Sequence, residues 1–322
     1  MNKSFAVFLI LLFGLNSHAF AQSFCRETRI SHQVASSAGT LEKYVYKQYR
    51  SEKGKDKQLS IGLMRPLDNL PDKKRPLIIG VHGGAFVDFC PFEPCYVKYS
   101  ENVLTPNFTP QGFITTSVQY RLTSPLDYKS FKVKDDKLLE THYKAAQDVR
   151  EAIKFIFENA DRFGVDRENV FLVGTSAGAI TVLHSAFMDE EEIPKNLLEK
   201  HGGLAKREKI KGVISFSGAI YDLSYLAGDD KVPVMLVHGT RDDIVPFEKG
   251  FYLRMTHLTP VYGGKAIFEE AKKQGIPAQG FFYDFGHGYP DKFLSGIFKN
   301  ANDFIRLNLN CPNRSPLNIL AK

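Results

Sequence analysis

The chain has 322 residues, 43% of them hydrophobic and 24% charged, with 42 basic against 36 acidic side chains. This apolar fraction is that of a globular protein and excludes a disordered or collagen-like chain. A formal charge of +6 is small at this length, and basic side chains are interleaved with acidic ones. The charge therefore gives no support to nucleic-acid binding.

The first 21 residues have the pattern of a secretory signal peptide. Lys3 supplies the positive start, residues 5–15 form an apolar run, and Ala19-Phe20-Ala21 fits the cleavage pattern. The run is short for a transmembrane helix. A lipid anchor on Cys25 is the alternative, but no small residue directly precedes that cysteine. We expect cleavage after residue 21 and a secreted or periplasmic protein without a stable membrane anchor.

After this segment, strands and helices alternate along the chain. Short apolar or alternating runs predict strands at residues 44–49, 59–64, 76–82, 113–121, 169–174, 212–216, 232–238 and 278–283. Apolar residues at helical spacing predict helices at 145–156, 177–187, 265–273 and 291–307. This alternation predicts an α/β fold with a mostly parallel central sheet and helices on both faces. No linker interrupts it, so residues 22–322 are expected to form one domain, with a charged insert at about 188–211 as a candidate cap over the sheet.

One motif has both the sequence and the context of a catalytic turn. Gly174-Thr175-Ser176-Ala177-Gly178 matches G-x-S-x-G and stands between a predicted buried strand and a predicted helix, as a nucleophile elbow does. The turn is so tight that the residues two before and two after the serine must lack bulky side chains. Gly174 and Gly178 satisfy this condition, so Ser176 is the candidate nucleophile.

A serine nucleophile needs a base, and the base needs an acid that orients it. On this kind of scaffold the chain order is serine, acid, histidine. The loop after the strand at 232–238 offers Asp242, with Asp243 as the alternative. His287 lies between two glycines after the strand at 278–283 and is the candidate base. His257 also follows the acid loop, but no obvious strand precedes it.

Hydrolysis of an ester or amide also needs donors aimed at the developing oxyanion. One candidate is the backbone N–H of Ala177, directly after the serine. The other is the N–H of Gly83 or Gly84, because these glycines follow the strand at 76–82 and let the main chain come close to the substrate. His82 is expected to shape this loop. No metal or cofactor is needed by such a site.

Together these motifs resemble those of α/β-hydrolase-fold esterases over about residues 77–307. The segments that resemble the hormone-sensitive-lipase-like and type-B carboxylesterase branches are His82-Gly83-Gly84-Ala85-Phe86, Tyr120-Arg121, Asp148 and the motif around Ser176. The resemblance implies an α/β-hydrolase fold and hydrolysis of carboxylic esters through an acyl-enzyme. The chain departs from the first branch at Ala85, where a third glycine is usual. It departs from the second at Thr175 and Asp242, where glutamate is usual, so the branch stays open.

Four cysteines follow the signal peptide, an even number in an oxidising compartment, so disulfides are expected. Cys90 and Cys95 bracket a turn-rich segment that can close locally, which would leave Cys25 to pair with Cys311. The other two pairings stay open. The spacing does not match a zinc site.

The substrate pocket is expected near the oxyanion glycines. The segment between Cys90 and Cys95 follows them closely, so it is predicted to shape the rim of the acyl pocket with Phe86 and Phe89. Tyr289, two residues after the candidate base, is a further candidate for the pocket. A disulfide that only stabilises the fold is the alternative role for this segment.

The sequence therefore predicts a secreted serine esterase that acts on short-chain or polysaccharide-linked acyl or aromatic esters. Two other functions are compatible with the motifs. A serine peptidase of the prolyl-oligopeptidase type shares the triad, but such chains are longer and carry a propeller domain. A secreted binding protein on the same scaffold would have lost catalysis. Acyl and alcohol specificity and oligomeric state stay open.

Overall fold

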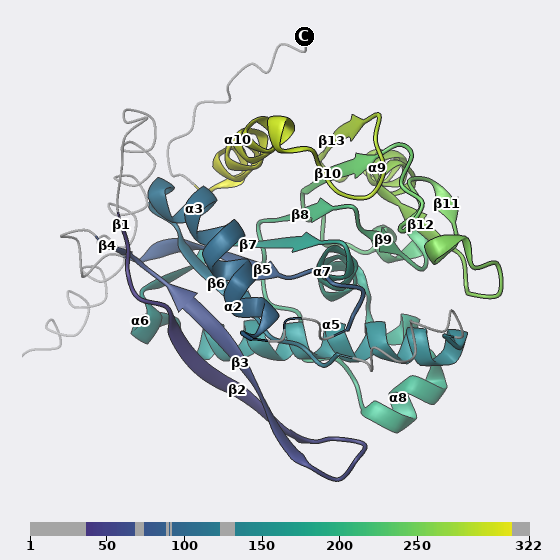
Figure 1. Ribbon diagram of the computed structural model, residues 1–322, viewed down its shortest axis with the longest axis horizontal. Coiled ribbons are helices and arrows are strands. Elements are labelled where there is room, and N and C mark those ends of the chain that lie inside the picture. The colour runs from purple at the N-terminus through teal and green to yellow at the C-terminus, as the bar shows by residue number, and fades with distance from the viewer. Residues whose placement is uncertain (1–36, 68–73, 88–89, 91, 123–132, 311–322) are drawn as a thin grey trace, which may run out of the picture.

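A single mixed sheet organises the computed structural model, which describes residues 37–67, 74–87, 90, 92–122 and 133–310 (Figure 1). The eight strands of the sheet lie in the order β13-β10-β8-β7-β5-β6-β3-β2. Their bounds are β2 Glu42–Arg50, β3 Asp56–Met64, β5 Arg75–Val81, β6 Ile114–Val118, β7 Val165–Thr175, β8 Gly212–Phe216, β10 Val234–Gly239 and β13 Ala278–Tyr283. The predicted signal peptide lies outside the described residues.

The direction of the strands confirms the mostly parallel sheet. Strands β6, β5, β7, β8, β10 and β13 pair in parallel, whereas β3 pairs antiparallel with both β6 and β2. Strand β5 is buried along its whole length, as expected for an apolar strand with helices on both sides. Two small sheets complete the strands: β1 Ser37–Ala38 with β4 Pro66–Leu67, and β9 Ala219–Ile220 with β11 Lys249–Gly250 and β12 Val261–Gly263.

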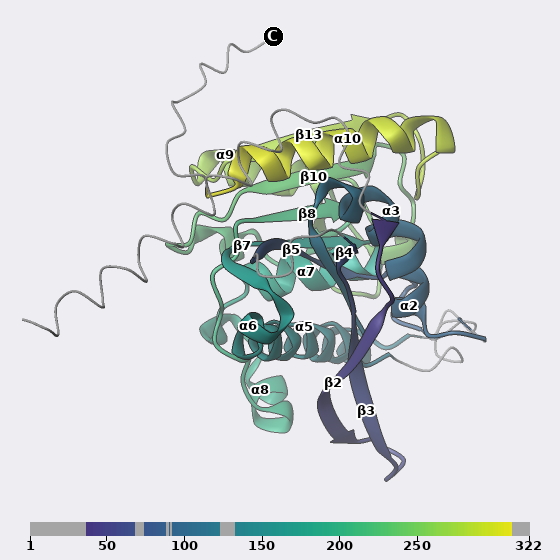
Figure 2. The same cartoon turned by 90° about the vertical axis from the view of Figure 1, so that its left-hand side faces the viewer.

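Helices cover both faces of the sheet (Figure 2). One face packs against the long helices α5 Asp135–Glu158, α7 Ala177–Phe187 and α9 Gly264–Lys273, in the larger hydrophobic core. The other face packs against α10 Asp291–Asn308 and a run of short helices, in a second core. That run comprises α2 Cys95–Tyr99, η1 Ser100–Leu104, α3 Thr105–Phe108 and η2 Thr109–Gln111. The remaining short helices are α6 Ala160–Phe163, η3 Glu190–Glu192, α8 Lys195–His201, η4 Leu223–Ala227 and η5 Tyr252–Arg254.

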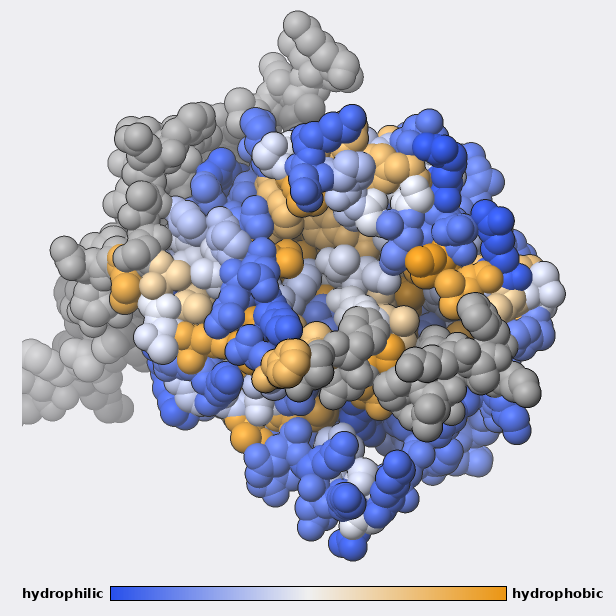
Figure 3. Space-filling view, viewed as in Figure 1, coloured by the Kyte–Doolittle hydropathy of each residue, from blue (hydrophilic) through white to orange (hydrophobic). Residues whose placement is uncertain are grey.

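The insert at 188–211 does not cap the sheet edge. Its apolar side chains Met188, Ile193 and Leu197 pack with Tyr143 and Ala146 of α5. Figure 1 accordingly shows α8 beside α5, on the outer side of the helical layer. Only Met188, Ile193, Leu197 and Ile210 are buried within the insert, and its charged side chains are exposed or partly exposed. The face of the molecule in Figure 3 is likewise mostly hydrophilic, with separate hydrophobic patches.

Candidate active site

Ser176 stands at a sharp turn between β7 and α7. Its backbone has φ 53° and ψ −119°, a conformation that L-residues rarely adopt, and its N–H donates to the carbonyl of Phe216 at 2.7 Å. The flanking glycines are required by contact distances. A Cβ on Gly174 would lie 2.3 Å from the carbonyl oxygen of Gly178, and a Cβ on Gly178 would lie 2.0 Å from that of Val81. The turn therefore exists only because both positions lack a side chain.

The structure brings the three sequence-predicted polar side chains together. His287 Nε2 lies 2.9 Å from Ser176 Oγ, and His287 Nδ1 lies 2.7 Å from Asp242 Oδ2. The acid follows β10 and the histidine follows β13, at the carboxyl ends of neighbouring parallel strands. Asp243 is exposed, and His257 instead contacts the carbonyl of Val133 at 3.1 Å. Of the residues weighed from the sequence, Asp242 and His287 are thus the pair that faces the serine.

The carboxylate of Asp242 is held on both of its oxygens. Oδ1 accepts the backbone N–H groups of Ile244 and Val245, each at 2.9 Å. Oδ2 faces two imidazoles, that of His287 and that of His238 at 3.2 Å. Burial alone would raise the pKa of the Asp242 carboxyl, but the hydrogen bonds from His238 and His287 outweigh it and place the pKa well below its usual range. The side chain is therefore an anion at neutral pH.

The glycine segment after β5 lies against the serine turn. A Cβ on Gly83 would be 2.8 Å from the carbonyl oxygen of Thr175 and 3.3 Å from Ser176 Cβ. Gly84, Ala85 and Phe86 all have positive φ, at 117°, 48° and 59°. Such a conformation is unusual for alanine and phenylalanine, and strained backbone of this kind is found at binding sites. Gly83 thus lies directly against the serine turn, and Gly84 follows it in the chain.

Ala177 supplies the other expected donor position. It is the first residue of α7, and first-turn N–H groups of a helix have no acceptor within the helix. His82 supports the loop rather than facing the serine: its Nδ1 contacts the carbonyl of Gly83 at 2.7 Å, and its own carbonyl accepts the hydroxyl of Tyr120 at 2.9 Å.

Tyr120, Arg121 and Asp148, which also contribute to the resemblance to esterases, form a hydrogen-bonded structural link near the site. Arg121 donates from its backbone N–H and from Nε to Asp148 Oδ2, at 2.9 and 2.8 Å. Lys47 of β2 also contacts this buried carboxylate at 2.9 Å. These contacts connect the segment after β6 to α5 and to the edge strand β2. The hydroxyl of Tyr120, in the same segment, donates to the carbonyl of His82.

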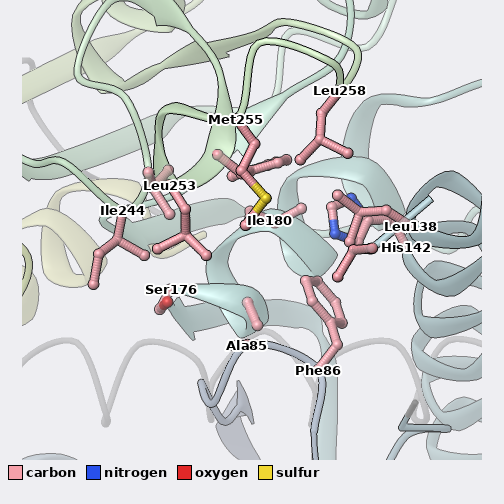
Figure 4. A pocket seen from close by; sticks show the side chains of 14 residues that line it. Ala85, Phe86, Leu138, His142, Ser176, Ile180, Ile244, Leu253, Met255 and Leu258 are labelled. Carbon is pink, nitrogen blue, oxygen red and sulfur yellow. The ribbon is translucent and has the colours of Figure 1, made fainter. Parts of the chain in front are cut away.

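An apolar pocket of about 50 Å³ opens beside Ser176 (Figure 4). Its lining, mostly apolar, consists of Ala85, Phe86, Val133, Leu138, His142, Ser176, Ala177, Ile180, Ile244, Val245, Tyr252, Leu253, Met255 and Leu258. Figure 4 shows Ser176 on one side of the pocket and His142 on the opposite side. The wall formed by residues 244–258 is not predicted from the sequence. Its apolar side chains Ile244, Leu253, Met255 and Leu258 are nevertheless unusual for a loop exposed to solvent.

Three side chains predicted at the pocket differ in their positions. Phe86 lines it and packs on His142, with ring centroids 4.2 Å apart. Phe89 lies outside the described residues. Tyr289 does not line the pocket; its hydroxyl donates to the carbonyl of Val237 at 2.7 Å and lies 2.8 Å from Ser217 Oγ. Since its hydroxyl contacts residues at the ends of β8 and β10, it connects the loop of the histidine to the sheet.

The polar end of the pocket is uncharged at neutral pH. Burial lowers the pKa of His142 well below its usual range and lowers the pKa of His184 to about 4. His142 Nδ1 lies 2.7 Å from the hydroxyl of Tyr221, which holds the ring in place. The pocket therefore suits a neutral, largely apolar group.

A disulfide joins Cys90 and Cys95, and Cys25 and Cys311 lie outside the described residues. The bridged loop borders a separate groove, lined also by His82 and Gln119, rather than the apolar pocket. Among the described residues, none from this loop lines the apolar pocket, although the loop was predicted to shape the rim of the acyl pocket. The bridge connects Cys90 to the first residue of α2.

No group of three or more His, Cys, Asp or Glu side chains forms a metal-binding cluster within the described ranges. In the same part of the chain, every helix is too short or too polar to cross a bilayer.

A serine on a strand–helix turn, an acid and a histidine after later strands, and a mostly parallel sheet define the α/β-hydrolase fold. Residues 67–231, just over half of the chain, match the BD-FAE family model, and the chain belongs to this family. The family model covers the glycine segment and the serine turn, and it ends before Asp242 and His287.

The similar proteins are lipases and esterases. Lipase 2 of Geotrichum candidum is 32% identical over 130 residues, which cover 39% of this chain and 21% of the relative. Probable carboxylesterase 1 of Arabidopsis thaliana is 30% identical over 151 residues, which cover 43% and 42%. The chain thus spans less than half the length of these curated relatives.

Among solved structures, propionate-bound esterase 2 of Thermogutta terrifontis has the same fold. It matches with a TM-score of 0.57 at 18% identity, over 85% of this chain and 97% of that chain.

Proposed function

We propose that the chain is an exported carboxylic ester hydrolase with Ser176 as nucleophile, His287 as general base and Asp242 as the orienting acid. The observation that carries the proposal is the continuous hydrogen-bonded series from Ser176 Oγ through His287 to Asp242, at 2.9 and 2.7 Å, beside an apolar pocket. Esterase activity is also what the BD-FAE family and the lipase and carboxylesterase relatives support.

The reaction follows from this geometry. His287 Nε2 takes the hydroxyl proton as Ser176 Oγ attacks the ester carbonyl, and Asp242 stabilises the imidazolium. The N–H groups of Ala177 and of Gly83 or Gly84 stabilise the oxyanion of the tetrahedral intermediate. His287 then gives its proton to the leaving alcohol, which leaves an acyl group on Ser176. Water, deprotonated by His287, attacks this acyl-enzyme, and His287 returns the proton to Ser176 Oγ as the acid is released.

The pocket favours a short, neutral acyl group. A cavity of about 50 Å³ among apolar side chains has room for a small hydrocarbon group, and it offers no cation for a charged acyl chain. The Thermogutta terrifontis esterase has been solved with propionate and with butyrate bound, in line with short acyl groups on this fold. Short-chain esters and acyl or aromatic esters linked to polysaccharide are the proposed substrates.

Export is part of the proposal. The signal-peptide pattern before residue 22 and the disulfide between Cys90 and Cys95 both fit a secreted or periplasmic protein, since disulfides persist in oxidising compartments. Amino-terminal sequencing of the protein exported by its host tests this part, with Gln22 as the expected first residue.

The test of the activity is a hydrolysis screen of p-nitrophenyl esters from acetyl to long-chain acyl, with cinnamoyl-type esters and a peptide panel beside it. Ser176→Ala is expected to lose about 10⁴-fold or more in kcat/KM. Ser185→Ala is the matched control, because Ser185 lies on the same helix and its hydroxyl donates to the carbonyl of Thr181, away from the site. An active S176A variant, or cleavage of peptides in preference to esters, would reject the assignment. If a serine-directed phosphonate fails to label Ser176, the non-catalytic binding protein is supported instead.

A further inference from the structure

A second histidine lies against the proposed acid, and the reaction described above does not use it. His238 is in β10, one residue before the strand ends, and only 1% of it is exposed. Its Nε2 lies 3.2 Å from Asp242 Oδ2 and 3.1 Å from the carbonyl oxygen of Val245. Asp242 Oδ2 is the same oxygen that faces His287 at 2.7 Å.

The tautomer of His238 follows from the hydrogen bond that its other ring nitrogen, Nδ1, accepts. The backbone N–H of Gly264, the first residue of α9, donates to His238 Nδ1 at 3.2 Å. A nitrogen that accepts a hydrogen bond cannot also carry a proton, so the ring proton is on Nε2, directed at the carboxylate and the Val245 carbonyl. The position of the ring is fixed as well, because it packs against Phe247 with centroids 5.7 Å apart.

With this donor, the carboxylate of Asp242 is saturated. A carboxylate has about four lone-pair sites. The N–H groups of Ile244 and Val245 fill two of them on Oδ1, and the imidazoles of His238 and His287 face the other oxygen. Two of these groups are adjacent residues of the loop that carries Asp242, one is at the end of β10 and one is in the loop after β13, and together they restrict rotation of the carboxylate.

We propose that His238 is a positioning residue for the triad, an inference that rests on the proposed function. Its Nε2–H donates to the Val245 carbonyl, and Nε2 lies 3.2 Å from Oδ2, so His238 holds the atom that orients His287 and draws negative charge away from it. Less charge on Oδ2 means less stabilisation of the His287 imidazolium. Removal of His238 is therefore expected to change how strongly Asp242 stabilises the imidazolium that forms during the reaction. The titratable side chains that act on Asp242 are His238, His287 and Tyr289.

Two substitutions separate the hydrogen bond from the volume of the ring. His238→Phe keeps a ring and removes the donor. His238→Gln places an amide N–H close to where Nε2 was, and so keeps a donor to Asp242. The N–H groups of Ile244 and Val245 are not changed in either variant, so only the group that faces Oδ2 differs.

The first measurement is the pKa of His287, from the imidazole ¹⁵N shifts in NMR titrations of the folded, unliganded protein, assigned with His287→Gln. We expect H238F to raise it by about 0.5–1 pH unit and H238Q to change it by less than half as much. This readout needs no substrate, so it stands even if ester hydrolysis fails. The control is His201→Phe, which removes another histidine beside a carboxylate, Glu140 at 2.8 Å, away from Ser176.

The second measurement is the pH profile of kcat/KM, whose acidic limb reports the base of the free enzyme. The limb is expected to move to higher pH in H238F by the same amount, with kcat lowered about tenfold and partly restored in H238Q. A residue with only a structural role would lower stability or activity and leave both pKa readouts in place. An unchanged or lowered His287 pKa in H238F, or an equal effect of H238F and H238Q, overturns the proposal.

Discussion

Substituting Gly178 by alanine should move the serine turn away from the end of β5. A Cβ at this position would lie 2.0 Å from the carbonyl oxygen of Val81 and 2.6 Å from that of His82. Real Cβ contacts stay above 3.0 Å, so the start of α7 and the end of β5 must move apart by at least 3.0 − 2.0 = 1.0 Å. Both contacts are to backbone, so no rotation of a side chain relieves them.

A shift of this size acts on catalysis and on stability. Displacement of catalytic groups by about 1 Å costs roughly 10²-fold in rate. Overpacking of a rigid core site costs about 3 kcal/mol at the upper end of the usual range, which lowers Tm by roughly 6 °C or more. The assays are kcat/KM on p-nitrophenyl acetate and a calorimetric melt of the Gly178→Ala variant.

The matched control is Gly296→Ala, also a glycine in a helix. Gly296 lies in α10, and no atom comes within 4 Å of a Cβ added there. This variant should keep its activity and gain slightly in stability, because alanine favours helix by about 1 kcal/mol over glycine. Activity of Gly178→Ala within about threefold of the parent, with an unchanged Tm, would refute the contact argument.

Three further predictions concern pH, the histidine loop and the disulfide. Burial lowers the pKa of His184 to about 4, so below its unfolded pKa of about 6.5 only the unfolded chain takes up a proton. The free energy of unfolding should thus fall by about 3 kcal/mol between pH 6.5 and pH 4, and urea titrations should find this slope reduced in His184→Phe. Tyr289→Phe should lower kcat about three- to tenfold, since it loosens the loop of His287, and an unchanged kcat would contradict this role. Replacing Cys90 and Cys95 together by serine should cost about 2 kcal/mol by loop-closure entropy, with the acetyl-to-longer-acyl rate ratio unchanged, and a changed ratio would place the loop at the pocket.

The sequence predicts the parts of the fold that local patterns determine. Continuous apolar runs predict β5 and β7 because strands covered on both faces have no polar side to present. The serine turn is predictable for a steric reason, since the turn excludes side chains at Gly174 and Gly178. The strand order places an acid and a histidine beside it, which is why the positions of Asp242 and His287 agree with the motif spacing.

The sequence does not predict contacts that depend on long-range packing. The short helices at 95–111 contain Pro106 and Pro110 and lack a helical period, so only their burial against the sheet reveals them. Tyr289 is expected in the pocket because it follows His287, yet its hydroxyl is turned to Val237. The direction of a side chain two residues from a known group depends on the loop, which no sequence spacing determines. The pocket wall formed by residues 244–258 is not predicted from the sequence for the same reason.

The residues that hold the acid are also part of the pocket wall. Ile244 and Val245 donate their backbone N–H groups to Asp242 Oδ1, and both residues line the pocket beside Ser176. An acyl group that presses on this wall therefore strains the same peptide groups that hold the carboxylate. Because the same two residues line the pocket and hold the carboxylate, we expect acyl chain length to affect kcat and not KM alone.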